Sequence, residues 1–230
     1  MSKHPAPRLP AEQLAASWQS ASLLLDYPDE NLLPRLKLID QLCGKLPPAV
    51  GTSLQATVRE LRSADLTTLQ QEYVETFDTR RRHNLFLTYF AHGDTRRRGV
   101  ALLRFKQTYL RSGFILDDTE LPDHLCVVLE YAATVDQRLG WGLLLDHRAG
   151  LELLRLALSD AGSKWLGAVQ AVTSTLPPLA GDEMVAIRRL AADGPPQEEV
   201  GLTPYATPAF DPATAPVQEL PMPTFPGAHR

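Results

Sequence analysis

The sequence predicts an all-α protein, a single-domain helical bundle of about eight or nine helices followed by a proline-rich C-terminal tail. Apolar residues recur every three or four positions through most of the first 193 residues, which is the period of an amphipathic helix. Prolines and glycines fall between these apolar stripes, and no stretch alternates apolar and polar residues convincingly enough to indicate a strand. With 230 residues and 44% hydrophobic content, the chain can bury one substantial core.

The first four stripes indicate four helices within the first 77 residues. Their members are Leu14, Trp18, Ala21 and Leu25; Leu32, Leu36, Ile39 and Cys43; Leu54, Val58 and Leu61; and Leu66, Leu69, Tyr73 and Phe77. Pro28 and the pair Pro47–Pro48 lie between stripes, where proline is expected because it cannot continue a helix from its interior. Asp65 directly precedes the fourth stripe and is a favoured N-cap residue.

The remaining helices follow in the same way. Asp94 or Thr95 can cap a long helix that ends before Gly113, and Pro122 suits the first turn of a helix from about Leu121 to Leu139. The later stripes are Leu125, Val128, Leu129, Ala132 and Val135; Leu151, Leu154, Leu158 and Ala161; Trp165, Val169, Val172 and Leu176; and Met184, Ile187 and Ala191. Gly140 and Pro177–Pro178 separate them.

The composition changes after Asp193. Residues 194–230 contain nine of the nineteen prolines, so this segment cannot form a helix and is expected to be extended and disordered. We therefore expect a flexible N-terminus over residues 1–10, an all-helical domain over residues 11–193 and a proline-rich tail over residues 194–230.

Several classes of function find no support in the sequence. There is no nucleophile elbow, phosphate-binding loop or dinucleotide fingerprint, and none of the six histidines is paired at the spacing of two metal ligands on one helical face. Two distant cysteines cannot form a zinc site, and a pI near 5.9 disfavours nucleic-acid binding. We expect no enzyme activity, no metal and no cofactor of its own. The apolar runs are too short for a signal peptide or a membrane span, so we expect a cytoplasmic protein without direct membrane insertion.

The segment Tyr73–Gly99, YVETFDTRRRHNLFLTYFAHGDTRRRG, is the most unusual part of the chain. Six arginines and one aspartate give residues 79–98 a charge of +5, whereas the whole chain carries −4. An arginine in the first turn of a helix faces the positive end of the helix dipole, which destabilises the helix by roughly 0.3–1 kcal/mol for each exposed arginine. We therefore expect carboxylate partners for these arginines. The predicted structural ion-pair cluster comprises Glu75, Asp78, Arg80, Arg81, Arg82, Asp94, Arg96, Arg97 and Arg98. The same arginines could instead bind an anion or a peptide backbone.

Aromatic residues and a nearby acidic stretch suggest a peptide-binding groove. The stretch LDDTELPDHL (116–125) places carboxylates beside apolar residues, although acids near a helix N-terminus can equally serve the helix dipole. The candidate apolar contacts are Tyr89, Phe90, Leu103, Tyr109, Leu121, Leu125 and Leu129, and the candidate acidic rim is Asp118, Glu120 and Asp123. An acidic helical body would attract a peptide that carries lysines or arginines.

These two motifs resemble those of the NarJ-type nitrate reductase delta subunits. The long arginine segment is similar to the family's signature, and ELPDHLCVVLEYA resembles its second block, which the wider TorD-like group of redox-enzyme maturation chaperones shares. The likeness covers roughly Leu14 to Leu190. It implies a TorD-like all-helical chaperone whose partner is the apo catalytic (alpha) subunit of nitrate reductase. Such a chaperone binds that subunit through its N-terminal peptide and holds it until the molybdenum cofactor is inserted.

Two other functions remain open at this point. The Arg80–Arg82 and Arg96–Arg98 runs could hold the pyrophosphate of the molybdenum cofactor directly, because guanidinium groups bind phosphate bidentately. A regulatory nucleic-acid binder could use the same arginines, but the acidic net charge and the lack of a recognition-helix motif disfavour it.

Overall fold

The computed structural model describes residues 4–117 and 119–179, together with residues 181, 185 and 187. This part of the chain contains ten α-helices, one π-helical turn and one 3₁₀ turn, and its only β feature is a single antiparallel bridge between Phe86 and His124. The all-α prediction is therefore confirmed. Asp118, most of the expected last helix and the whole predicted tail, with its boundary at residue 193, lie outside the described residues.

The first four helices lie where the apolar stripes predict them. They are α1 (Ala11–Leu25), α2 (Leu32–Cys43), α3 (Pro48–Arg62) and α4 (Leu66–Tyr73). Pro48 occupies the first turn of α3, where its missing N–H leaves no donor unsatisfied. The Asp65 carboxylate caps α4 by accepting a hydrogen bond of 3.0 Å from the backbone N–H of Thr68, as predicted.

The arginine-rich segment forms short, irregular elements before a long helix. The π-helical turn η1 (Val74–Asp78) continues α4, and the 3₁₀ turn η2 (Arg81–His83) follows it. Then come α5 (Tyr89–His92) and α6 (Arg96–Arg111). Thr95 is the N-cap residue of α6, but its side chain makes no capping hydrogen bond. The chain leaves α6 through Gly113, whose φ of 75° only glycine adopts readily.

The helix predicted for residues 121–139 is wrong in its extent. The structure has two helices here, α7 (Leu125–Thr134) and α8 (Gln137–Asp146), and Pro122 lies before α7 rather than in its first turn. Asp136 separates them because its carboxylate accepts a hydrogen bond of 2.8 Å from the Leu139 N–H and so caps α8. Gly140 lies within α8 rather than between helices. The last two described helices are α9 (Arg148–Asp160) and α10 (Leu166–Thr175).

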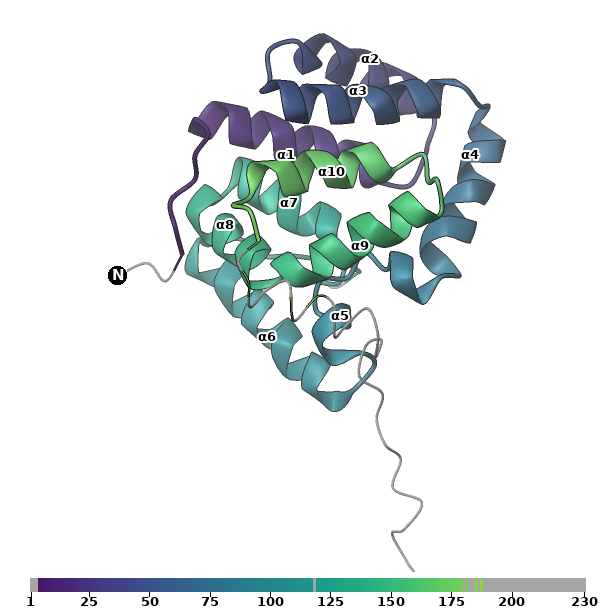
Figure 1. Cartoon of the computed structure of the whole chain (residues 1–230). Helices are drawn as coiled ribbons and strands as arrows, with labels where there is room; N and C mark the ends of the chain where they lie inside the picture. The colour runs from purple at the N-terminus through teal and green to yellow at the C-terminus, as the bar shows by residue number, and fades with distance from the viewer. Residues whose placement is uncertain (1–3, 118, 180, 182–184, 186, 188–230) are drawn as a thin grey trace, which may run out of the picture. The chain divides into compact units, whose positions relative to one another are not determined.

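Helices from both ends of the described chain form the centre of the bundle (Figure 1). Helix α1 packs along α7, and α10 packs against α3, α1 and α9. The α2–α3 pair covers one end of this central group, whereas α5 and α6 lie at the opposite end. Trp18 of α1 is fully buried, and its indole N–H donates to the Thr175 hydroxyl of α10 at 3.0 Å. This hydrogen bond joins residues 157 positions apart and fixes α1 against α10.

Glycines permit the closest helix contacts. Gly167 of α10 lies against the Ser53 carbonyl of α3, and a Cβ atom added there would overlap that oxygen and the Thr57 hydroxyl. Gly140 of α8 lies against Ala132 of α7 in the same way. Helices can approach this closely only where one of them lacks a side chain.

We predict that Gly167→Ala destabilises the protein because the added methyl group must push α10 away from α3. The free energy of unfolding should fall by about 1–3 kcal/mol in urea titrations followed by circular dichroism. The matched control is Gly99→Ala in α6, where a new Cβ meets nothing within 4 Å. This control should be neutral or stabilising by up to about 1 kcal/mol. Equal stability of both variants would contradict the close α3–α10 contact.

Candidate functional site: a cavity with an acidic rim

The two sequence motifs that point to function meet in space. Residues 84–88 of the first motif lie against residues 122–125 of the second motif. The Leu87 N–H donates to the Asp123 carbonyl at 3.0 Å, and the Leu125 N–H donates to the Leu85 carbonyl at 2.8 Å. The Tyr109 hydroxyl of α6 donates to the Pro122 carbonyl at 2.6 Å. These bonds hold the loop that precedes α7 against the chain that precedes α5.

A buried carboxylate lies at the centre of this junction. The Asp123 side chain is fully buried and accepts hydrogen bonds from both the backbone N–H and the hydroxyl of Thr88. The Arg98 guanidinium lies 3.8 Å from this carboxylate, 3.3 Å from the Asp94 carboxylate and 5.2 Å above the Phe86 ring. Removing one partner of such a buried pair leaves the other charge without compensation, so the group acts as a unit.

The predicted arginine cluster is divided between separate sites. Arg98 joins the Asp123 group, and Arg80 forms an exposed ion pair of 3.0 Å with Glu75. The other members of the prediction, namely Asp78, Arg81, Arg82, Arg96 and Arg97, are exposed. Within the described chain, no ion pair joins Asp78 to these arginines. The structure thus links only part of the predicted cluster, and the link uses Asp123, which we expected at a binding rim.

The predicted peptide contacts are also divided. Tyr89, Phe90, Tyr109, Leu125 and Leu129 are core residues, each no more than 6% exposed. Leu103, Glu120 and Leu121 lie at the surface, and Asp118 is outside the described residues. Asp123 is not at the rim, because its carboxylate points inward to Thr88 and Arg98. Of the predicted contacts, Glu120 and Leu121 line a cavity.

This cavity lies between the end of α1, the loop before α7 and α7 itself, and has a volume of about 470 Å³. Its lining residues are Ser22, Leu23, Asp26, Phe86, Thr119, Glu120, Leu121, His124, Cys126, Val127 and Glu130. The Ser22 hydroxyl donates to the Cys126 carbonyl at 3.0 Å and so joins the α1 wall to the α7 wall. The Phe86 and His124 rings pack edge to face with their centroids 5.1 Å apart.

Three carboxylates give the cavity an acidic rim, which we define as Asp26, Glu120 and Glu130. All three are exposed, and all three raise the pKa of the Cys126 thiol, although burial is the larger cause. Burial and the acidic rim both favour the neutral form of this thiol, which is the less nucleophilic one. Arg35 lies 3.2 Å from Asp26 and partly balances its charge. The cavity as a whole combines apolar walls with a negative rim.

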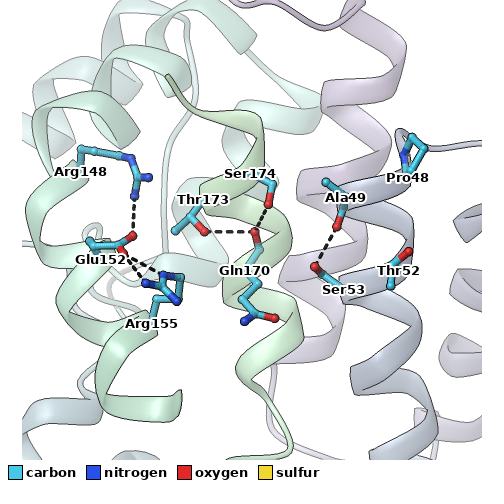
Figure 2. A pocket seen from close by; sticks show the side chains of 10 residues that line it. All are labelled: Pro48, Ala49, Thr52, Ser53, Arg148, Glu152, Arg155, Gln170, Thr173 and Ser174. Carbon is cyan, nitrogen blue, oxygen red and sulfur yellow. Dashed lines mark hydrogen bonds and ion pairs between the residues drawn. The ribbon is translucent and has the colours of Figure 1, made fainter. Parts of the chain in front are cut away.

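A second cavity, of about 700 Å³, is lined by two arginines and one glutamate instead of three carboxylates. It lies between α3, α9 and α10 (Figure 2), and its charged residues are Arg148, Glu152 and Arg155 on α9. The Glu152 carboxylate receives hydrogen bonds from Arg148 at 3.3 Å and from the Arg155 Nε at 2.9 Å. Burial alone would raise the pKa of Glu152, but these two arginines outweigh it and lower the pKa. The carboxylate therefore stays ionised between the arginines.

Sequence reasoning did not identify most residues of the acidic-rimmed cavity. Asp26 follows the end of α1 and Glu130 lies about 100 residues later in α7, so only the packing of α1 on α7 brings them together. The sequence could have indicated the α9 ion pairs, because the spacing of positions 148, 152 and 155 places their side chains on one helical face. In the described residues, no cluster of histidine, cysteine and carboxylate side chains is arranged to hold a metal ion. None of the described helices has the length and hydrophobicity needed to cross a membrane.

We predict that Asp123→Ala lowers the free energy of unfolding by about 3–5 kcal/mol, because it leaves both Thr88 donors unpaired and leaves Arg98 with only the exposed carboxylate of Asp94. Asp123→Asn should cost less, since its amide oxygen still accepts a hydrogen bond. Urea unfolding followed by circular dichroism measures both. The control is Asp78→Ala, which removes an exposed carboxylate and should change stability by less than about 0.5 kcal/mol. If Asp123→Ala were as stable as this control, the buried group would not support the fold.

The protein should lose stability as the pH falls below about 6.5. Desolvation lowers the pKa of His83, His124 and His147 below the usual 6.5. Each imidazole therefore takes up a proton in the unfolded chain before it does so in the folded protein. Stability present above pH 6.5 is lost below it, by up to about 1.4 kcal/mol per pH unit for each imidazole that stays neutral.

This pH effect is measured by comparing denaturant midpoints at pH 7.5 and pH 5.5. The His124→Gln variant should lose less stability over this interval than the wild type, because one of the three imidazoles is gone. A midpoint that does not depend on pH in the wild type would contradict the burial of these rings.

Comparison with known proteins places these features in a family. NarX of Mycobacterium tuberculosis, a nitrate reductase-like protein, is 42% identical over 158 residues, which are 69% of this chain and 24% of NarX. The nitrate reductase molybdenum cofactor assembly chaperone NarJ of Escherichia coli is 33% identical over 147 residues, which are 63% of this chain and 62% of NarJ. The matched region thus spans less than two thirds of either relative.

A solved structure of a redox enzyme maturation protein from Archaeoglobus fulgidus has a similar fold. The TM-score is 0.51 with 22% identity, and the match covers 75% of this chain and 96% of that protein. The family model of the nitrate reductase delta subunit matches residues 43–171, which are more than half of the chain and include both motifs. The predicted resemblance is confirmed, and the chain belongs to the nitrate reductase delta subunit family.

Proposed function

We propose that this protein is an assembly chaperone for respiratory nitrate reductase. It binds the N-terminal segment of the apo catalytic (alpha) subunit in the acidic-rimmed cavity and holds it until the molybdenum cofactor has been inserted. Family membership and the role for which the E. coli relative is named support the chaperone class. The E. coli relative NarJ is named as an assembly chaperone, which agrees with the lack of a catalytic signature in the sequence. The proposed location is the cytoplasm.

The observation that carries this proposal is the pairing of apolar walls with a carboxylate rim. Leu23, Leu121 and Val127 supply apolar surface, of which Leu121 is 42% exposed and available for contact. An amphipathic peptide can place its apolar side chains on this surface while its lysines or arginines reach the acidic rim. The opposite charges mainly speed the encounter and select the orientation of the peptide.

The size of the cavity limits how much of the client it can enclose. A volume of about 470 Å³ lies at the lower end of the range of small-ligand pockets, so it suits a few anchoring side chains and not a whole segment. The rest of the segment must lie on the surface around the cavity. Binding by a small anchor and a charged rim is reversible, and mass action can release the client when its segment finds a better partner.

Direct handling of the molybdenum cofactor by the Arg80–Arg82 and Arg96–Arg98 runs has less support. None of these arginines lines either of the two cavities described above. Arg98 is engaged with Asp94 and Asp123, and the exposed members lie on two different elements, η2 and α6. In the proposed mechanism, the cofactor is cargo of the client and not a ligand of these arginines.

Titration calorimetry with a peptide from the first twenty or so residues of the catalytic subunit tests this function. The wild type should bind with micromolar or higher affinity. The Glu120→Lys, Glu130→Lys double variant should bind at least tenfold more weakly, because two attractive charges become repulsive. Its matched control is Glu12→Lys with Glu60→Lys, which reverses two exposed carboxylates on α1 and α3 outside the cavity and should keep wild-type affinity. No binding by the wild type would reject the proposed function, whereas equal loss in both variants would reject the acidic-rimmed cavity as the site.

A further inference from the structure

Helix α6 is the most basic element of the described chain. Its sixteen residues include six lysines and arginines and no aspartate or glutamate, although the whole chain carries a net charge of −4. Arg98 faces inward and is engaged with Asp94 and Asp123. The basic residues outside that group lie on the exposed part of the helix. Neither the chaperone function nor the acidic-rimmed cavity accounts for this concentration of positive charge.

The solvent-facing side of α6 also carries apolar side chains. Val100, Leu103 and Leu110 are 56%, 57% and 60% exposed. Their spacing of three and seven residues places them in one row along the helix. The buried residues Ala101 and Phe105 lie on another face, against the rest of the domain. The apolar row is therefore not needed for packing within the described part of the chain.

A row of arginines runs beside the apolar row. Arg97, Arg104 and Arg111 are spaced by seven residues and are all exposed. Seven residues are close to two helical turns, so the three guanidinium groups share one edge of the exposed face. Ile115 extends the apolar surface beyond the end of the helix and is 81% exposed. The exposed face thus has an apolar ridge with a positive border.

We propose that this exposed face of α6 binds the surface of an anionic lipid membrane peripherally, without crossing it. Helices that lie in a membrane interface have an apolar face bordered by lysines and arginines, whose aliphatic stems bury while their charged ends reach lipid phosphates. Each basic residue near an anionic surface strengthens such binding, and salt weakens it. The inference does not depend on the proposed peptide binding.

The geometry favours a lipid surface over an acidic protein. The α6 face is the exposed side of one helix, and neither of the two cavities described above is lined by a residue of α6. A positive border beside an apolar row matches the anionic headgroups and acyl chains of a lipid surface, and such binding needs no complementary cavity. Its exposed apolar residues Val100, Leu103, Leu110 and Ile115 are all aliphatic, and the aliphatic stems of the bordering arginines can bury beside them at a lipid interface.

Vesicle co-sedimentation of the full chain tests this inference. The protein should bind vesicles that contain phosphatidylglycerol and phosphatidylcholine, should not bind pure phosphatidylcholine, and should dissociate at high salt. The triple variant Arg97→Glu, Arg104→Glu, Arg111→Glu should bind at least tenfold more weakly. The Val100→Asp, Leu110→Asp double variant should also bind more weakly, because the apolar ridge is interrupted.

Matched controls on α2, on α3 and in the loop between them test whether binding requires the α6 face or only the net charge and exposed apolar surface of the protein. Lys37→Glu, Lys45→Glu, Arg59→Glu reverses three exposed charges outside α6, and Leu33→Asp, Leu38→Asp replaces two exposed leucines of α2. Both should bind vesicles like the wild type. Circular dichroism verifies that each variant is folded, and the triple α6 variant should still bind the client peptide. The proposal is overturned if the wild type ignores anionic vesicles, if controls and α6 variants lose binding equally, or if α6 binds only an acidic polypeptide such as polyglutamate.

Discussion

The carboxylate of Asp123 is the constraint on which the candidate site depends. It is a buried charge, and a buried charge is tolerated only when hydrogen bonds and an opposite charge replace its water. Thr88 and Arg98 supply these from the segment before α5 and from α6. This group therefore holds together the segment before α5, the start of α6 and the loop before α7. The loop that carries Glu120 and Leu121 is fixed because its next residues belong to this group.

The position of the acidic-rimmed cavity follows from this group and from the packing of α1 on α7. Asp123 fixes the loop on one side, and the Ser22–Cys126 hydrogen bond joins the two helices on the other. The lining residues Phe86 and His124 stack where the two sequence motifs meet. A rigid cavity of this kind costs little entropy when it receives a flexible peptide, so most of the ordering cost falls on the client.

The charges of the domain are separated in a way that suits two different contacts. Carboxylates gather around apolar walls between α1 and α7, and arginines gather beside an apolar ridge on α6. The first arrangement is concave and favours a basic segment of polypeptide. The second lies on the exposed side of one helix and favours an anionic surface. The two arrangements involve different helices, so the two proposed contacts need not compete.

Local sequence was enough to predict the all-α class, the helices of the first 73 residues and the Asp65 cap, because helix period, proline position and capping depend on neighbouring residues. It was also enough to indicate that the motifs around Arg98 and Asp123 matter and to which family they are similar. Only tertiary packing decided their roles. Asp123 looked like a rim residue and became a buried partner of Arg98, whereas Glu130 drew no attention and lines the cavity. Whether a residue is buried depends on which distant helices pack together, and local sequence patterns do not show which helices these are.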